Sequence, residues 1–435
     1  MFNIVKGTHD VIQKEAAKYT YVENLLMREA QVFGYKEFRT PIMEYSELFL
    51  RSTGESSDIV RKEMYTFTDK GDRSITLRPE MTAGVIRSMV NEKLFINQDY
   101  PVKAFYVGPN FRYERPQQGR YRQFNQFGIE CVGVDSPYRD IEVIMLGYSA
   151  LKLLGFKNIK LEINSLGDAE TREKYQAALR EYFGKHIETM CDDCKERYKL
   201  NVLRILDCKV EHDIEINKDA PIISDYYSEK SKDNFDVITN FLKENEIEYK
   251  INNNLVRGLD YYSGIVFEYH YTSSQGKDYG ALGGGGHYGS LVKEIGGPDL
   301  EGVGFAFGIE RLINLMEDDN LLDENEINDP LDCYVMPVNT QNEKISFEVA
   351  SYLRTNGYSA DVCLEHKSMG QMFKKAERRN VLYAVIIGDD EEKEKKVNLK
   401  NLVSQEQISI SLDHLLDKLD ELFGENEDEH IHHHD

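Results

Sequence analysis

The chain has 435 residues, of which 41% are hydrophobic and 30% are charged. This composition is typical of a soluble globular protein with two or three domains, because one core rarely serves so long a chain. It contains no run of eighteen apolar residues and begins with a polar segment, so we expect a cytoplasmic protein without membrane contact. The formal net charge of −23 excludes nucleic-acid binding by overall attraction, so any RNA contact must use local clusters of Lys and Arg.

The first segments predict a helix followed by a strand. Apolar residues at helical spacing predict a helix over residues 14–33 that ends at Gly34. Residues 34–49 then predict a strand that runs through Pro41 into a short helix. Pro41 taken alone indicates only an edge strand or a turn.

The next segment, residues 74–90, predicts a strand that breaks at Pro79 and a helix that begins at about Thr82. Glu80 and Thr82 therefore lie where the strand ends. Polar side chains at this position either cap the helix or meet a ligand, and the segment alone favours neither.

Residues 105–131 are the most informative segment, because their alternation predicts an antiparallel hairpin around a turn at residues 116–119. Arg112 and Glu114 share one face before the turn. The even positions share a face after it: Arg120, Arg122, Phe124, Gln126 and Glu130, with Gly128 leaving space. Guanidinium groups fit phosphate oxygens and a phenyl ring fits a purine, so this face suits a nucleotide together with an amino group. A solvated edge strand is the alternative.

From about residue 166 to 235 the pattern changes to charged helices, which indicates a helical insertion before strands resume at Tyr249. The insertion contains Cys191, Cys194, Cys208 and His212, a spacing that can hold zinc. Two CxxC pairs would be a stronger pattern, so we expect reduced thiols in a helical hairpin and no metal.

The following segments carry further candidate residues. Residues 256–269 join a glycine turn to an alternating strand, with Arg257, Tyr261 and Tyr262 at its entrance. The run GGGGHYG from Gly283 contains G-x-G-x-x-G but lacks the helix and the acidic residue of a dinucleotide site. Its glycines can instead let the backbone approach a small ligand closely. Residues 302–312 predict a strand that enters a helix, with Arg311 in its first turn.

The last part of the chain predicts a separate small domain. The acidic stretch 317–330 reads as a linker, and alternating strands and helices after it predict a parallel sheet. Within this domain a basic helix carries Lys374, Lys375, Arg378 and Arg379, either as a solvated face or for RNA. The final dozen residues are acidic and are expected to be disordered.

Three of these segments resemble, in order, the motifs of the class II aminoacyl-tRNA synthetases: residues 34–49 motif 1, residues 111–124 motif 2 and residues 302–312 motif 3. RPQQGRYRQF from Arg115 and RGLDYY from Arg257 are similar to the histidyl-tRNA synthetases in particular. The resemblance implies an α+β catalytic domain over residues 1–325, with an antiparallel sheet flanked by helices and the helical insertion at about 166–235. A C-terminal α/β anticodon-binding domain over 331–421 and an acidic tail over 422–435 complete the expected organisation.

The resemblance also implies an activity, the ATP-dependent ligation of L-histidine to tRNA(His) through a histidyl-adenylate. It implies Mg²⁺ with the ATP, and a homodimer. The residues that it assigns to catalysis are Arg112 and Arg257, and those for ATP are Arg112, Glu114, Arg120, Phe124 and Arg311. Those for histidine are Glu80, Thr82, Arg112, Gln126, Glu130, Arg257, Tyr261, Tyr262 and Tyr288, and those for the tRNA acceptor end are Arg115 and Gln117.

The chain departs from the family at one place, where the usual GGGRYDGL reads GGGHYGSL with His287, Gly289 and Ser290 as the replacements. The alternative interpretation is a synthetase-like regulatory subunit of ATP phosphoribosyltransferase in histidine biosynthesis. Such subunits share the catalytic fold, normally lack the anticodon-binding domain and do not charge tRNA. The retained arginines and residues 331–421 favour the enzyme.

Overall fold

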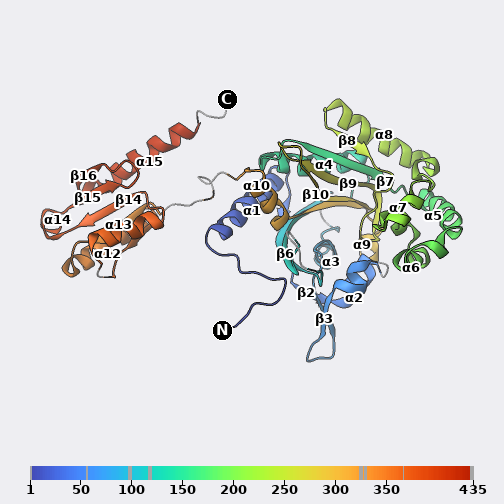
Figure 1. The fold of residues 1–435 in the computed structure, drawn as a ribbon, viewed down its shortest axis with the longest axis horizontal. Coiled ribbons are helices and arrows are strands. Elements are labelled where there is room, and N and C mark those ends of the chain that lie inside the picture. The colour runs from blue at the N-terminus through green and yellow to red at the C-terminus, as the bar shows by residue number, and fades with distance from the viewer. Residues whose placement is uncertain are drawn as a thin grey trace. The chain divides into compact units, whose positions relative to one another are not determined.

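The computed structural model of this chain describes residues 2–54, 57–96, 100–115, 120–322, 327, 331–365 and 367–431, with side chains to residue 424. The chain divides into two compact units, Met1–Ile327 and Asn328–Asp435 (Figure 1). Among the helices of the described ranges, none is long and apolar enough to cross a membrane.

The first unit is built on an eight-stranded sheet. Its strands, in spatial order, are β1 (Lys36–Glu37), β5 (Val102–Phe111), β6 (Gln123–Val132), β11 (Gly302–Gly308), β10 (Asp278–Tyr288), β9 (Tyr262–Thr272), β7 (Ile159–Ser165) and β8 (Tyr249–Ile251). The inner pairs are antiparallel, while β1 with β5 and β7 with β8 are parallel. The predicted hairpin is confirmed, because β5 pairs with β6 from Val102 to Phe111.

The two faces of this sheet differ in chemistry because side chains alternate along each strand. One face carries large apolar residues, among them Phe127, Phe267 and Phe305, that form the main core. The helices α1 (Lys14–Val32), α4 (Pro137–Leu153), α8 (Glu229–Glu244) and α10 (Ile309–Asp318) contribute buried residues to that core. The opposite face is rich in glycine, and Gly128, Gly284, Gly286 and Gly304 lie on it. The sheet therefore has a packed side and a side with room for other groups.

The segment around Pro41 differs from the predicted single strand. The chain forms β1, then β2 (Met43–Tyr45), and then α2 (Ser46–Thr53). The pairing of β1 with β5 ends before Pro41, which has no amide hydrogen to donate to a ladder. After the proline, β2 joins a second sheet with β4 (Ser74–Leu77) and β3 (Tyr65–Thr68). The break after β4 is confirmed, since α3 (Thr82–Asn91) follows it.

The insertion forms its own small core from α5 (Ala169–Gly184), η2 (Ile187–Thr189), α6 (Asp192–Leu200), η3 (Val202–Asp207), α7 (Glu211–Asn217) and η4 (Ile223–Tyr226). The helical region extends past the expected end near residue 235, because α8 continues to Glu244. However, Phe235, Ile238 and Leu242 of α8 are buried in the main core. The independent part of the insertion therefore ends before α8.

The second unit contains a five-stranded sheet in the order β13 (Ala360–Val362), β12 (Cys333–Pro337), β14 (Tyr383–Ile387), β15 (Lys396–Asn401) and β16 (Gln407–Ser411). The first three strands are parallel, as predicted, whereas β15 and β16 form an antiparallel hairpin that the sequence analysis missed. Its helices are α12 (Glu343–Thr355), α13 (Met369–Arg378), α14 (Asp389–Glu394) and α15 (Leu415–Ile431).

The helix α15 enters the acidic tail and ends at Ile431. Leu422 and Phe423 pack against the core of the second unit. The Phe423 ring lies 5.4 Å from the ring of Tyr358 and 5.5 Å from that of Tyr383. Burial of these apolar groups explains why the acidic composition does not end the fold at residue 421.

Candidate active site

Glu130 is the centre of a buried hydrogen-bond cluster on the glycine-rich face of the sheet. Its carboxylate accepts hydrogen bonds from the hydroxyls of Thr82 at 2.7 Å, Tyr106 at 3.0 Å and Tyr288 at 2.7 Å. Burial raises the pKa of Glu130 and the three hydroxyls oppose that effect, so that the pKa is about 7. The cluster is a preorganised place for a cationic or hydrogen-bonding ligand.

Glycines make the space for this cluster. A Cβ atom on Gly128 would overlap the Tyr106 hydroxyl, and one on Gly304 would overlap the Glu130 carboxylate. Gly128 of β6 pairs with Tyr106 of β5, and Gly304 of β11 pairs with Glu130 of β6. Larger residues would close the hollow, so the absence of a side chain at these positions is a requirement of the site.

Glu80 lies beside the cluster at the start of α3. Its carboxylate accepts from the backbone N–H of Ala83 at 3.1 Å, so Glu80 caps the first turn of α3 from the position before the N-cap residue Met81. Burial raises its pKa. Arg112 donates from Nε to the carbonyl of Pro79 at 2.8 Å, and its charge acts on the Glu80 carboxylate. The cap and the candidate ligand site therefore use the same residue.

Tyr261 and Tyr262 form the wall next to Glu130. Their rings lie 4.6 Å apart, and Tyr261 also makes an edge contact with Tyr288 at 5.8 Å. Arg257 packs over the Tyr262 ring at 5.9 Å and forms an ion pair with Glu268. Its Nε atom is buried and has no hydrogen-bond partner among the described residues. Arg257 can therefore donate to a ligand without giving up its ion pair.

A group of arginines lies at the open ends of β5 and β6. The Arg112 guanidinium packs over the Phe124 ring at 5.2 Å, and Arg120 lies 3.9 Å from the Glu114 carboxylate. Burial lowers the pKa of Arg311, and the nearby charge of Arg120 lowers it further. Two like charges held near each other favour the binding of an anion, which fits the phosphates assigned to them.

Arg311 and Gln126 have partners within the protein. Arg311, on α10, donates to the carbonyl of Tyr279. Gln126 accepts from the amide of Asn110 at 2.6 Å on the glycine-rich face.

The turn of the hairpin is described only at its edges. Arg115 is exposed, and Gln117 lies outside the described residues. Because β6 begins at Gln123, the strand alternation does not extend to Arg122, which packs instead over the Tyr113 ring at 3.9 Å.

Three residues of the site were missed by sequence reasoning. Tyr106 and Asn110 share the even-numbered face with Arg112, so extending the alternation backward along β5 would have found them. Glu63 ends η1 (Ile59–Glu63), and burial raises its pKa, with a further rise from the neighbouring Glu114. No local sequence pattern predicts that Glu63 lies at the site, because only tertiary packing brings it close to Glu114.

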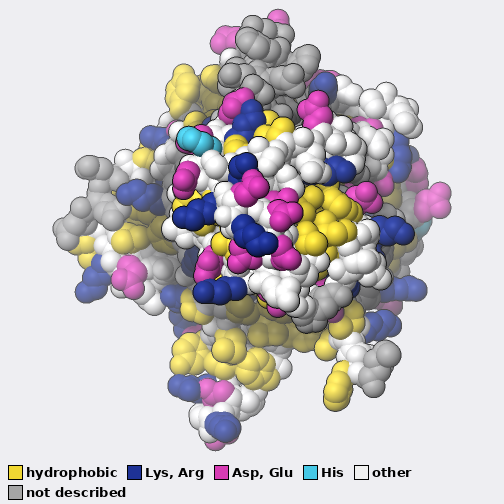
Figure 2. All heavy atoms as spheres, turned by 90° about the vertical axis from the view of Figure 1, so that its left-hand side faces the viewer, with side chains coloured by type: hydrophobic (Ala, Val, Ile, Leu, Met, Phe, Trp, Pro, Cys, Tyr) yellow, Lys and Arg dark blue, Asp and Glu magenta, His cyan; other side chains and the backbone are white. Residues whose placement is uncertain are grey.

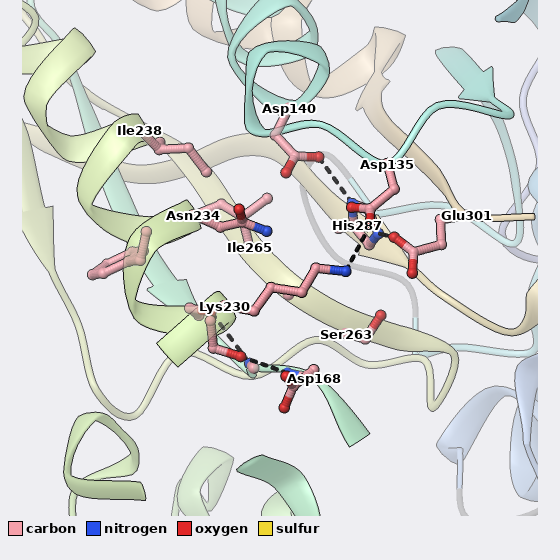
Figure 3. Close-up of a pocket in the computed structure, with 15 residues that line it drawn as sticks. Asp135, Asp140, Asp168, Lys230, Asn234, Ile238, Ser263, Ile265, His287 and Glu301 are labelled. Atoms are coloured by element: carbon pink, nitrogen blue, oxygen red, sulfur yellow. Dashed lines mark hydrogen bonds and ion pairs between the residues drawn. The ribbon is translucent and has the colours of Figure 1, made fainter. Parts of the chain in front are cut away.

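The departure at His287 lies on the opposite side of the sheet from Glu130. Tyr288 points to the glycine-rich face, whereas His287 pairs with Asp140 at 3.0 Å and with Glu301 at 2.8 Å. Asp135 and Lys230 line the same polar pocket and also form an ion pair (Figure 3). His287 thus supplies a cation to two acids, a role that arginine can also fill, and leaves the tyrosine cluster unchanged.

Motifs 2 and 3 lie on adjacent strands, β6 and β11, with the acids and tyrosines between them and α3. This arrangement of antiparallel sheet and motifs is that of a class II aminoacyl-tRNA synthetase catalytic domain. A family model described as histidyl-tRNA synthetase matches residues 7–312, and one described as anticodon binding domain matches residues 332–422.

Known proteins give the same result over nearly the whole chain. A histidine--tRNA ligase of Bacillus licheniformis is 45% identical over 415 residues, which cover 95% of this chain and 97% of that protein. One of Bacillus subtilis is 44% identical over 418 residues, with the same coverage. The crystal structure of apo S. aureus histidyl-tRNA synthetase matches with a TM-score of 0.82 at 36% identity, covering 96% of this chain and 100% of that one. The chain belongs to the histidyl-tRNA synthetase family.

The environment of His287 generates a prediction about pH. Burial opposes its charge, but Asp140 and Glu301 raise its pKa to about 10. Because the pKa of His287 is higher in the folded protein than in the unfolded chain, where it is near 6.5, its positive charge stabilises the fold. This stabilisation is complete below about pH 6.5 and is lost as the pH rises through about 10. We expect the wild-type free energy of unfolding to fall by on the order of 3 kcal/mol more than that of His287→Arg between about pH 7 and 10.

Denaturant unfolding of both proteins at a series of pH values measures this difference. The arginine variant keeps its charge over the whole range and retains the Lys230–Asp135 pair, so it is a matched control. Parallel pH profiles for the two proteins would contradict the assignment of a charged His287.

Proposed function

We propose that this protein activates L-histidine with ATP and transfers the histidyl group to tRNA(His). The observation that carries the proposal is the Glu130 cluster beside the arginines of motifs 2 and 3. It combines a place for an amino acid with cations for a nucleotide. The full-length similarity to proteins named histidine--tRNA ligase supports the same reaction.

Histidine fits the buried acids and tyrosines. Its ammonium group and imidazole offer several donors, and Glu80 and Glu130 are buried acceptors close to Thr82. Tyr261, Tyr262 and Tyr288 line the space beside them, and Gln126 lies along the same face. A site whose buried groups depend on a ligand's hydrogen bonds rejects amino acids that cannot form them.

ATP fits the arginines at the ends of the hairpin. In the first step the histidine carboxylate attacks the α-phosphorus, and the bond from that phosphorus to the pyrophosphate oxygen breaks. Arg112 and Arg257 are assigned to the α-phosphate, because one lies next to Glu80 and the other next to Tyr262. Arg120 and Arg311 are assigned to the outer phosphates. Fixed cations stabilise the charge that develops on phosphoryl oxygens in the transition state.

The adenine and the metal have candidate partners in the same group. Phe124 and Arg311 are assigned to the two faces of adenine, and Glu114 to its amino group. Mg²⁺ prefers oxygen ligands, and the carboxylates of Glu63 and Glu114 lie near each other and near Arg112. When bound, Mg²⁺ would neutralise the charge of the departing pyrophosphate.

Binding of tRNA requires local basic groups. Lys and Arg are interspersed with Asp and Glu on the face drawn in Figure 2. On α13, Lys375 pairs with Glu365 and the adjoining Arg379 pairs with Asp361, while Lys374 and Arg378 are exposed. This helix is our candidate for anticodon contact, which agrees with the anticodon-binding model that covers it. Arg115 and Gln117 are assigned to the acceptor end.

We further propose a homodimer in the cytoplasm. The surface of the second sheet and its flanks exposes Ile42, Met43, Tyr45 and Phe67, each more than 40% accessible. Contiguous apolar groups of this kind favour burial against another protein surface. Motif 1, which contains Ile42, Met43 and Tyr45, is assigned to the subunit interface.

The regulatory-subunit interpretation has less support. The residues that match an anticodon-binding model form a folded unit of their own, and such a unit serves recognition of tRNA rather than of an enzyme partner. The replacement at His287 does not reach the tyrosine cluster.

Histidine-dependent exchange of pyrophosphate into ATP tests the first step, and charging of tRNA(His) tests the second. We expect exchange with histidine and with no other amino acid, because the buried acceptors require the donors of its side chain. Exchange with a different amino acid, or none with histidine, would refute the proposal.

Arg257→Ala tests the assignment of the second α-phosphate cation. We expect its exchange rate to fall by roughly 100-fold or more, because a fixed charge at the reacting phosphate is removed. Arg257→Lys is the matched variant, since it keeps the charge and the pairing with Glu268 but lacks the forked donor. It should retain an intermediate rate, and near-normal exchange by the alanine variant would exclude the role.

Gln117→Ala tests the assignment of the motif 2 turn to tRNA. Gln117 precedes the ATP-binding residues of β6, so we expect charging of tRNA(His) to fall by roughly tenfold while exchange stays near the wild-type rate, as loss of a single hydrogen bond predicts. An equal decrease in the two assays would place Gln117 in the activation step instead.

A further inference from the structure

Three cysteines and an aspartate of the insertion converge on one point. The thiols of Cys191, Cys194 and Cys208 and a carboxylate oxygen of Asp213 all lie within 4.8 Å of one another. They come from three elements: the start of α6, the end of η3 and the first turn of α7. We propose that these four groups bind a structural Zn²⁺ ion.

The separations of these atoms match a tetrahedral zinc site. Zn–S bonds of about 2.3 Å at tetrahedral angles place two sulfurs about 3.8 Å apart. The Sγ atoms of Cys191 and Cys208 are 3.8 Å apart, and Cys208 Sγ lies 3.3 Å from Asp213 Oδ2. Thiolates and a carboxylate are both ordinary zinc ligands, and four protein ligands leave no open position for catalysis.

The backbone is arranged to stabilise thiolates. The N–H of Cys194 donates to Cys191 Sγ at 3.4 Å, and the N–H of Val210 donates to Cys208 Sγ at 3.5 Å. Cys191 also caps the N-terminus of α6, where the helix dipole favours negative charge. These contacts orient the sulfurs and favour the deprotonated form that a metal requires.

Asp213 provides the second, independent observation. Its side chain is fully buried, yet none of the described ion pairs involves it, and its Oδ1 atom has no hydrogen-bond partner within the described ranges. A buried carboxylate without a cation costs several kcal/mol. Its Oδ2 atom accepts from the N–H of Cys191 at 3.2 Å and from the thiol of Cys208 at 3.3 Å, so the carboxylate is held in place, but no cation is among its described partners. A bound Zn²⁺ would supply the missing positive charge.

This ligand set differs from the Cys191, Cys194, Cys208 and His212 set that the sequence spacing could supply. His212 completes the sequence pattern, but it is exposed on α7, whereas Asp213 is buried at the cluster. Consecutive residues of a helix point about 100° apart, so one of the two is excluded when the other faces inward.

The site has a structural consequence for the catalytic peptide. Cys208 ends η3, whose Arg204 donates to the carbonyl of Gly258 at 3.0 Å. Asn201, which caps η3, donates to Asp260 at 2.8 Å. Gly258 and Asp260 lie in the peptide RGLDYY, so zinc would hold the segment that supports Arg257 and the two tyrosines.

Metal analysis of the full chain tests the proposal. The protein is purified with a non-thiol reductant from medium that contains zinc, dialysed without chelator, and analysed by mass spectrometry of its metals. We expect about one zinc per chain in the wild type and in His212→Ala, and a loss of at least tenfold in Cys208→Ser and Asp213→Ala. The proposal is overturned if the wild-type protein contains no zinc. It is also overturned if His212→Ala loses its zinc while Asp213→Ala retains it.

A second measurement needs no variant and so does not depend on variants that fold poorly. Wild-type protein stripped of metal is titrated with cobalt(II) chloride alone and followed by absorption spectroscopy. Thiolate-to-cobalt charge transfer and the intense d–d bands of tetrahedral cobalt support the site, with saturation at one equivalent. Octahedral spectra, or no spectrum with free thiols, exclude it.

Discussion

The candidate active site depends on one physical constraint, the burial of the Glu130 carboxylate among hydroxyl groups. Thr82, Tyr106 and Tyr288 each donate to it, and they come from a helix and two strands of the catalytic unit. A buried carboxylate needs these donors, and the donors need the space that glycines leave on neighbouring strands. The position of α3 and the spacing of the central strands are therefore both fixed by contacts with Glu130. The proposed histidine site is built on these fixed elements.

Because side chains alternate along each strand, one face of the sheet packs in the core and the other face carries the candidate site. Phe305 packs in the core, while Gly304 beside it leaves room for Glu130. At the end of β10, Tyr288 joins the Glu130 cluster, and His287 points the other way to Asp140. The replacement of the family's arginine by His287 thus lies in an ion-pair network on the face of the sheet opposite the candidate site. Adjacent residues of a strand have different roles because their side chains point to opposite faces of the sheet.

The insertion has a structural link to the peptide RGLDYY, residues 257–262. Arg204 and Asn201 contact Gly258 and Asp260, and the proposed zinc ligands flank the segment that carries them. A small core such as that of the insertion gains much from a metal, since few apolar groups are available to fix its short helices. The metal would serve catalysis indirectly, by holding the support of RGLDYY.

The sequence by itself determined the helices and strands that short-range residue patterns predict. Alternation around residues 116–119 predicted the hairpin of β5 and β6, helical spacing predicted α1, and the motifs indicated the family. Tertiary structure decided which groups meet. Tyr106 and Tyr288 lie 24 and 158 positions from Glu130, and no local pattern specifies that both reach its carboxylate. Strand register and helix rotation made these choices, and likewise placed Asp213 rather than His212 at the thiols. Both depend on packing between distant segments, which local periodicity does not encode.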